Sequence, residues 1–348
     1  MPTSAFVRCS IVFWAAANDA DSELVLSIGV LLFVGVLLSQ DLPAILATLG
    51  HAGWGLLFVA LFHLLPLVID AVAICVLIER DPSRSPLRDS LLARWIGESA
   101  NSLMPAGQLG GPVLMARHLA QRGLPMEEAA AAITVSTTLQ TFAQIAFALL
   151  GVVALGAQTT HFSPAALRSA ALIASAFLAI QVGGFYVIQR RGLFSKLMNA
   201  VRRFSRKRDW SQWVAQAQAI DLAVQGTYRR NGPVTASFVL SLVGWIIGTG
   251  EVFLIARFLG TPVSWRDAFV LESLGQAIRG AGFAIPGALG VQEGGYLLLA
   301  PLAGLAPNAA LALSLAKRAR ELLLGLPGLL YLRFASHDTA AAAGTAPP

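Results

Sequence analysis

Six apolar stretches of this chain each approach the length needed to cross a lipid bilayer. A transmembrane helix needs roughly 20 mostly apolar residues to cover about 30 Å of hydrocarbon. The chain has 348 residues, of which 56% are hydrophobic and 13% are charged, and this balance excludes a soluble globular domain. The sequence therefore predicts an all-α polytopic membrane protein. The predicted spans are residues 24–40, 53–79, 126–156, 166–189, 232–259 and 307–333.

Two further apolar stretches, 88–122 and 265–306, are interrupted by glycine, proline and charged residues. Residues 98–112 read ESANSLMPAGQLGGP, and residues 279–290 read RGAGFAIPGALG. Glycine adopts backbone angles that other residues avoid and proline lacks an N–H donor, so helices break at such sites. In lipid, irregular backbone is tolerated only where protein or a wet cavity surrounds it. We predict that each stretch forms a re-entrant helical hairpin; a loop outside the membrane is the alternative.

The basic residues predict how the chain is oriented. Residues 190–231 form the most basic segment, and the positive-inside rule places it in the cytoplasm. The connections 41–52 and 157–165 carry only Asp41 as a formal charge, so we place them outside. When the membrane crossings are counted from these assignments, residues 88–122 enter the membrane from the cytoplasm and residues 265–306 enter it from outside. The same count places both termini in the cytoplasm. The basic residues of the segment are Arg190, Arg191, Lys196, Arg202, Arg203, Arg206, Lys207, Arg208, Arg229 and Arg230.

This arrangement predicts an inverted-topology repeat of about six full spans and two re-entrant hairpins, with eight full spans as the alternative. The first repeat is 24–156, and the second is 157–333. Residues 1–23 are predicted to be an N-terminal extension, although SIVFWAAAN within it has a weak likeness to a signal peptide. We expect residues 334–348 to be a disordered tail.

Part of the basic segment, RRFSRKRDW, combines basic and aromatic residues, which favours a helix lying on an anionic leaflet. Nucleic-acid binding is the competing interpretation of such a patch, and we predict none in a polytopic protein. Two cysteines are too few for a disulfide framework, and the five histidines lack ligand spacing. We therefore predict no metal and no cofactor. Motifs for nucleophilic or phosphate chemistry are also missing from the sequence, so a transporter is favoured over an enzyme.

Charged residues at membrane depth indicate where a ligand binds, because such charges are costly unless they are paired. Glu272, Gln276 and Arg279 share one helical face. Lys317, Arg320 and Glu321 share another, whereas Arg318 points elsewhere. Alternatively, the last helix starts later and these charges form its cytoplasmic flank. We hypothesise a cationic pocket at the outer hairpin tip, made by Arg279, Lys317 and Arg320 and balanced by Glu272, Glu293 and Glu321.

The first hairpin carries a similar set of polar side chains. Arg94, Glu98 and Asn101 share a face that leads to its tip. Arg94 and Glu98 are either part of a site or a structural pair four residues apart. In the span 53–79, Asp70 follows His63 along one side and is either proton-linked or a satisfied polar contact.

Three segments resemble the flippase-like transmembrane region of lysylphosphatidylglycerol synthases. They are ESANSLMPAGQLGGPVLMARHL (98–119), PGALGVQEGGY (286–296) and LALSLAKRARELLLGLPGLL (311–330), and the resemblance covers roughly 24–333. Within that family the chain is most similar to hopanoid-biosynthesis-associated membrane proteins. The resemblance implies these candidate site residues: Glu98, Asn101, Pro105, Gly107, Gly110, Pro286, Gly287, Gly290, Glu293, Gly294, Arg320 and Glu321.

The resemblance also implies lipid handling, because synthases of this kind move a modified phospholipid between leaflets. Their aminoacyl transfer belongs to a separate soluble domain and is not expected here. We predict a lipid translocase or lipid-transfer component of the bacterial inner membrane, associated with hopanoid biosynthesis or transport. The expected partners are a hopanoid or phospholipid and proteins of lipid biosynthesis. The alternatives are an enzyme or accessory subunit that modifies lipid head groups, and a scaffold without transport.

Overall fold

The structure is a computed structural model, and it describes residues 50–78, 86–103, 110–156, 186–204, 211–282 and 285–344, with a few isolated positions outside these ranges. All of its regular elements within these ranges are helices, as the sequence predicts. In chain order the helices through the middle of the molecule are α4 (Gly55–Cys75), α5 (Pro86–Leu103), α6 (Gly110–Gln121), α7 (Met126–Gly156), α9 (Leu193–Phe204), α10 (Ser211–Arg229) and α11 (Asn231–Phe258). They are followed by α12 (Trp265–Ala281), η2 (Pro286–Ala288), α13 (Val291–Leu299), η3 (Ala300–Ala303) and α14 (Pro307–Gly344).

Three of the described helices, α4, α7 and α11, are long and apolar enough to cross a membrane. They correspond to the predicted spans 53–79, 126–156 and 232–259. Large apolar side chains on them face outward: Leu61 is 57% exposed and Val153 is 72% exposed, which suits contact with lipid rather than water. The predicted spans 24–40 and most of 166–189 lie outside the described residues. The protein is therefore a helical membrane protein, and its full number of spans stays a prediction.

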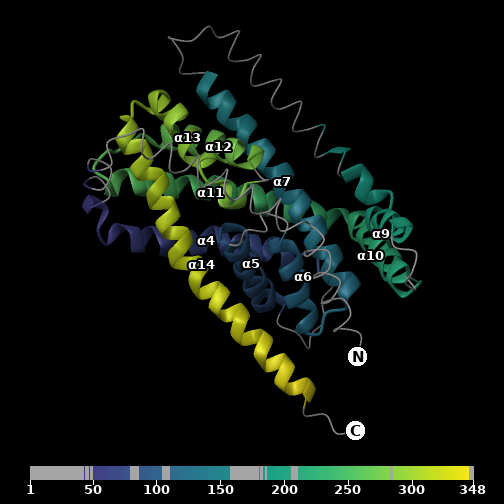
Figure 1. The fold of residues 1–348 in the computed structure, drawn as a ribbon. Helices are drawn as coiled ribbons and strands as arrows, with labels where there is room; N and C mark the ends of the chain where they lie inside the picture. Colours follow the sequence, from purple (N-terminus) through teal and green to yellow (C-terminus); the bar gives the residue numbers. More distant parts are fainter. Residues whose placement is uncertain are drawn as a thin grey trace.

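The sixth predicted span, 307–333, lies within α14, which starts at Pro307 and continues to Gly344. The helix thus extends through residues that we expected to be a disordered tail. A run of alanines, residues 340–343, explains this, because alanine has the highest intrinsic helix propensity. Figure 1 shows α14 as the long yellow helix that crosses α4 obliquely.

Both glycine-interrupted stretches fold as two helices around a break. In the first, α5 packs against α6, and the connecting residues 104–109 lie outside the description. In the second, α12 packs against α13, and the backbone between them takes positive φ angles at Gly287 (59°) and Gly290 (76°). The break between α12 and α13 approaches the end of α5, because a Cβ atom at Gly287 would lie 3.0 Å from the backbone oxygen of Ser102. The leaflet from which each hairpin enters stays a prediction.

α4 packs closely on α11, and this pair contacts α5 of the first hairpin and α12 of the second (Figure 1). The two helices run antiparallel, since Gly250 of α11 faces Phe62 and Gly244 faces Asp70. Glycine at these positions lets helix backbones approach closely, a common feature of membrane helix pairs. This approach brings polar side chains of α4 and α11 together, such as His63 and Glu251.

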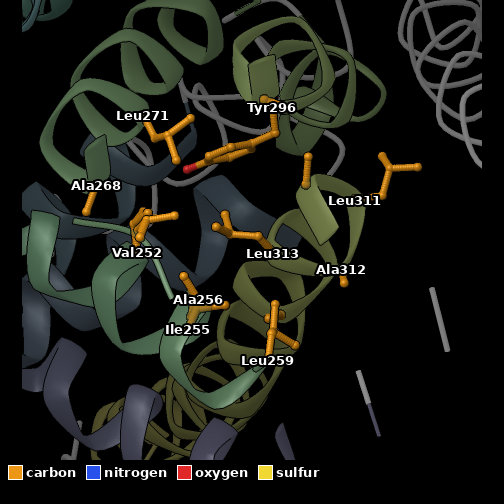
Figure 2. Packing of buried hydrophobic residues seen from close by; sticks show 14 of the residues in the cluster. Val252, Ile255, Ala256, Leu259, Ala268, Leu271, Tyr296, Leu311, Ala312 and Leu313 are labelled. Carbon is orange, nitrogen blue, oxygen red and sulfur yellow. The ribbon is translucent and has the colours of Figure 1, made fainter. Parts of the chain in front are cut away.

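Two apolar clusters hold the hairpins in place. One joins α11, α12, α13 and α14, and Figure 2 shows Val252, Ile255, Leu271, Tyr296 and Leu313 around its interior. The other joins α4, α5, α6, α7 and α10 and includes Ile74, Ala93, Leu119, Ile133 and Ile220. Several charged side chains of these helices are also buried within the protein, among them Glu251, Glu272 and Lys317.

The basic segment contains α9 and α10, which lie together beside α7 (Figure 1). The carboxylate of Asp221 in α10 accepts hydrogen bonds from the backbone N–H groups of Phe194 (3.0 Å) and Ser195 (2.8 Å). These are N–H groups of the first turn of α9, which have no partner within the helix. Asp221 therefore anchors the start of α9, while the side chains of the RRFSRKRDW stretch lie outside the description.

Candidate functional site

Two groups of buried ion pairs lie between the hairpins and α4, α11 and α14. We call the first the central cluster: His63, Asp70, Arg94, Glu98, Glu251, Glu272, Lys317 and Arg320. We call the second the hairpin cluster: Arg279, Glu293, Arg318 and Glu321. Buried charge in a membrane protein is expensive unless it is paired, and each of these side chains has an oppositely charged partner or, for His63, two carboxylate partners.

Arg320 of α14 bridges two carboxylates from different helices. Its Nη1 donates to Oε1 of Glu98 in α5 (3.1 Å), and its Nε donates to Oε1 of Glu251 in α11 (3.2 Å). A planar guanidinium offers donors in a fixed fork, which suits two acceptors better than a lysine ammonium does. Arg320 thereby links α5, α11 and α14 at one point.

His63 of α4 lies between the same two carboxylates. Its Nε2 is 2.7 Å from Oε1 of Glu98, and its Nδ1 is 2.8 Å from Oε2 of Glu251. His63 and Glu251 are 188 residues apart in the chain, so only the packing of α4 on α11 brings them together.

Lys317 makes the deepest ion pair of the cluster. Its side chain is 1% exposed, and its Nζ donates to Oε2 of Glu272 at 2.7 Å. The Tyr296 hydroxyl (3.2 Å) and the Gln276 amide (2.8 Å) also donate to this carboxylate. Glu272 thus has three donors, which compensates for its removal from water.

Asp70 is the main partner of Arg94. The Arg94 Nη2 lies 2.8 Å from Oδ2 of Asp70 and 3.9 Å from Oε2 of Glu98, its neighbour one turn along α5. Gln140 of α7 donates to Asp70 (2.7 Å) and accepts from Arg94 (3.2 Å). Arg94 thus joins α5 to α4 and α7, in addition to the pair that it forms with Glu98 along its own helix.

The hairpin cluster stabilises the break between α12 and α13. Arg318 donates to Glu293 (3.0 Å) and Glu321 (3.1 Å) and to the backbone oxygens of Gly287 (2.5 Å) and Ala288 (3.2 Å). These carbonyls belong to irregular backbone, which needs partners at membrane depth. Arg318 contacts η2 and α13, whereas Lys317 and Arg320 contact Glu251 of α11. Its bond to Glu321 is a contact with the face from which we expected it to point away.

Three more contacts complete this cluster. Arg279 of α12 donates to Glu321 (2.5 Å) and to Gln292 (2.8 Å). Glu293 accepts the backbone N–H of Gly290 at 2.8 Å, so it caps the start of α13. Arg279, Glu293 and Glu321 therefore act together to hold α12, α13 and α14.

A cavity of about 220 Å³ opens between the hairpins and reaches both clusters. Its wall includes His63, Glu98, Arg320, Arg279 and Glu321 from the clusters. Neutral polar side chains add further donors and acceptors: Asn101, Ser102, Thr137, Gln140, Thr141, Gln144 and Gln276. The cavity can thus bind a polar or charged group while apolar helices surround it. Among the described residues, no group of three or more His, Cys, Asp or Glu side chains is arranged to hold a metal ion.

Comparison with known families adds a finding that covers most of the chain. The family model described as the lysylphosphatidylglycerol synthase transmembrane region matches residues 23–328. The chain belongs to this family. No curated protein and no solved structure matches it. The predicted family is confirmed, and membership relates this membrane protein to lipid modification or lipid flipping. Its closeness to hopanoid-associated proteins stays a prediction.

In this member of the lysylphosphatidylglycerol synthase transmembrane family, the predicted site residues fall into three groups. Those in the clusters are Arg94, Glu98, Glu272, Arg279, Glu293, Lys317, Arg320 and Glu321. Those that shape the hairpins are Asn101, whose Oδ1 accepts from the Gly111 N–H, together with Gly110, Pro286, Gly287 and Gly290. Gly294 of α13 faces open space, and Pro105 and Gly107 lie outside the described residues.

The structure brings the residues of the hypothesised cationic pocket together only in part. Lys317 pairs with Glu272 and Arg279 pairs with Glu321, whereas Arg320 pairs with Glu98 and Glu251 of other helices. The arginines share carboxylates, since Glu321 pairs with both Arg279 and Arg318 and Glu98 lies near both Arg94 and Arg320, so the cations of the family's transmembrane region here lie beside acidic side chains.

His63 and Glu251 were not among the predicted site residues. Glu251 is an acidic residue within an otherwise apolar span, and it is 2% exposed. An ionisable residue inside a transmembrane segment is by itself a signal of a functional site. That rule, applied to the spans as strictly as to the hairpins, would have found Glu251 and His63.

Proposed function

We propose that this chain is a lipid translocase of the bacterial cytoplasmic membrane, and that a lipid head group passes through the cavity between the two hairpins while the acyl or polycyclic tail stays in lipid. The observation that supports this most is the cavity itself. It combines charged and neutral polar walls with lipid-facing apolar helices. Its volume of about 220 Å³ is below the roughly 300–1,000 Å³ of pockets that enclose a whole small molecule. It suits a head group rather than an entire lipid.

The chemistry of the walls favours a charged, zwitterionic or polyhydroxylated head group. Glu98 and Arg320 offer charges of both signs at the cavity wall, and Thr137, Gln140 and Gln276 offer neutral donors and acceptors. The resemblance to hopanoid-associated proteins makes a polyhydroxylated hopanoid the first cargo to test, with phospholipid as the second. The proposed inverted repeat places this site near the bilayer midplane, where transporters with such repeats bind their substrates.

A leaflet-resolved assay tests the proposal. Purified protein is reconstituted into vesicles that contain a fluorescent phospholipid or a hopanoid, and the outer-leaflet fraction is followed by chemical quenching or extraction. We expect faster movement of unaltered lipid than in protein-free vesicles, and we expect Glu98→Gln to slow it. Arg257→Lys, at an exposed position in the last turn of α11, is the control and should leave the rate unchanged.

Two other outcomes would contradict the proposal. A new lipid product, detected by mass spectrometry, would indicate head-group modification instead. If the protein is folded, as judged by its thermal unfolding, and gives neither lipid movement nor a new product, the result would indicate a scaffold.

A further inference from the structure

Both ring nitrogens of His63 contact carboxylate oxygens, and this contact pattern requires an additional proton. Nε2 lies 2.7 Å from Glu98 and Nδ1 lies 2.8 Å from Glu251. An ionised carboxylate can only accept a hydrogen bond, and a neutral imidazole has only one N–H to donate. With both carboxylates ionised and the imidazole neutral, one of these short contacts would oppose two lone pairs. The arrangement is satisfied when one more proton is bound, either on the imidazole or on one of the carboxyl groups.

The charges of the central cluster lead to the same conclusion. Among the residues that the structure describes, its cations are Arg94, Lys317 and Arg320, and its acids are Asp70, Glu98, Glu251 and Glu272. Three positive charges therefore face four negative charges. The hairpin cluster balances itself with two arginines and two glutamates, so it supplies no compensating charge. One proton held by His63 and its two carboxylates makes the central cluster neutral, which a buried site in a membrane strongly favours.

Arg320 is the hydrogen-bond donor available to Nε2 of His63 once this proton has left. Its Nη1 lies 3.1 Å from Oε1 of Glu98 and 3.2 Å from Nε2 of His63. While Nε2 carries a proton, both groups donate to Glu98. When that proton leaves, the lone pair on Nε2 can accept from Arg320, and Glu98 loses at least one donor.

Glu98 is the carboxylate of the central cluster that is most open to the cavity. Its side chain is 24% exposed, compared with 14% for Asp70, 3% for Glu251 and 4% for Glu272. A change of its partners at the cavity wall therefore changes what the cavity can bind. The groups that face His63 are Glu98 from α5, Glu251 from α11 and Arg320 from α14, and Asp70 lies further along α4 itself.

We infer that His63, Glu98 and Glu251 form a proton-binding site, and that occupancy of this site is coupled to occupancy of the head-group cavity, so that a proton gradient drives lipid movement. This inference rests on the proposed function and names its energy source. The proton moves between the His63–carboxylate site and the water that reaches the cavity through Glu98. No covalent bond to the lipid forms or breaks.

The proton site can be tested on the protein alone, by nitrogen-15 NMR of histidine-labelled protein in lipid nanodiscs. The His63 signal is identified by its loss in His63→Gln. We expect both ring nitrogens to carry a proton at neutral pH, where a free imidazole is largely neutral. Glu98→Gln removes one negative charge and should return His63 to the neutral form. If the extra proton is on a carboxyl group instead, infrared spectra should show a protonated-carboxyl band that Glu98→Gln or Glu251→Gln removes. A neutral His63 in the unmodified protein, together with the absence of such a band, would overturn the inference.

Coupling is tested in vesicles that contain a fluorescent phospholipid, with the membrane potential clamped by potassium and valinomycin. For one proton per lipid, a gradient of one pH unit should shift the distribution of lipid between leaflets by about tenfold. His63→Gln should abolish this shift. His118→Gln should retain it, because His118 is also buried, at 3% exposure, but lies in α6 outside both clusters and contacts the Tyr331 ring.

The outcomes separate the inference from the function on which it rests. Lipid movement that ignores the gradient would overturn proton coupling and leave the translocase intact. If no lipid moves under any condition, the proposed function fails, and the NMR measurement still decides whether the proton site exists. Glu98→Gln serves as the second variant if His63→Gln does not fold.

Discussion

Replacing Arg320 by alanine would remove the guanidinium that bridges Glu98 and Glu251. Glu251 is buried, at 3% exposure, and Glu98 is partly buried at the cavity wall; each lies within 3.2 Å of this guanidinium. Removing one partner of a buried ion pair costs about 3–5 kcal/mol, because the remaining charge is left uncompensated. At about 2–4 °C per kcal/mol for a chain of this order of size, thermal unfolding should shift downward by on the order of 10 °C.

Arg320→Lys separates the role of the charge from the role of the fork. An ammonium keeps the positive charge but donates from one atom, so it cannot reproduce both bonds, one from Nε and one from Nη1. Losing one charge-assisted hydrogen bond costs about 1.5–3 kcal/mol, which corresponds to roughly 10- to 150-fold if that bond is needed in the slowest step of transport. We expect this variant to fold, with a smaller loss of stability than Arg320→Ala, and to lose most lipid movement.

The assay combines thermal unfolding in detergent with the leaflet-resolved measurement in vesicles. Arg257→Lys is the matched control, since it makes the same substitution at an exposed site of α11 and should change neither quantity. Transport at the unmodified rate by well-folded Arg320→Lys would refute the need for the fork. Unchanged unfolding of Arg320→Ala would refute the view that this guanidinium compensates the carboxylates of Glu251 and Glu98.

Three further predictions address other parts of the chain. Cysteine labelling should find residue 205 accessible from the cytoplasm and residue 160 from outside, and cytoplasmic labelling at 160 would contradict the inverted repeat. Gly287→Ala should lower the unfolding temperature, because the φ angle of Gly287 is 59° and a Cβ atom there would lie 3.0 Å from the Ser102 backbone. The expected strain is about 1–2 kcal/mol. The control Gly226→Ala, at a position of α10 with open space around it, should leave the unfolding temperature unchanged. Neutralising part of the basic segment should weaken binding to anionic vesicles by about 1 kcal/mol per residue, measured by sedimentation, without preventing membrane insertion. Failure to insert would show that the segment has a structural role. The residues changed are Arg202, Arg203, Arg206, Lys207 and Arg208.

Features that depend on neighbouring residues were predictable from the sequence. Hydropathy is a local property, so the spans 53–79, 126–156 and 232–259 match α4, α7 and α11 within a few residues. The break at 286–290 was also local, because proline and glycine act on their own backbone. Charges at membrane depth on α14, such as Lys317 and Arg320, could be read from their position in an apolar helix.

The partners of those charges depended on tertiary structure. Arg320 meets Glu98 across 222 residues of chain and Glu251 across 69, and His63 meets Glu251 across 188. Helical spacing tells which side chains share a face of one helix, but it carries no information on which helix packs against that face. For this reason the sequence led us to group Arg320 with its neighbours in the second hairpin, whereas the packing of α4, α5 and α11 on α14 decides its partners. The sequence by itself determined that charge had to be compensated within the membrane, and the packing of distant helices decided that His63 lies between the carboxylates of Glu98 and Glu251.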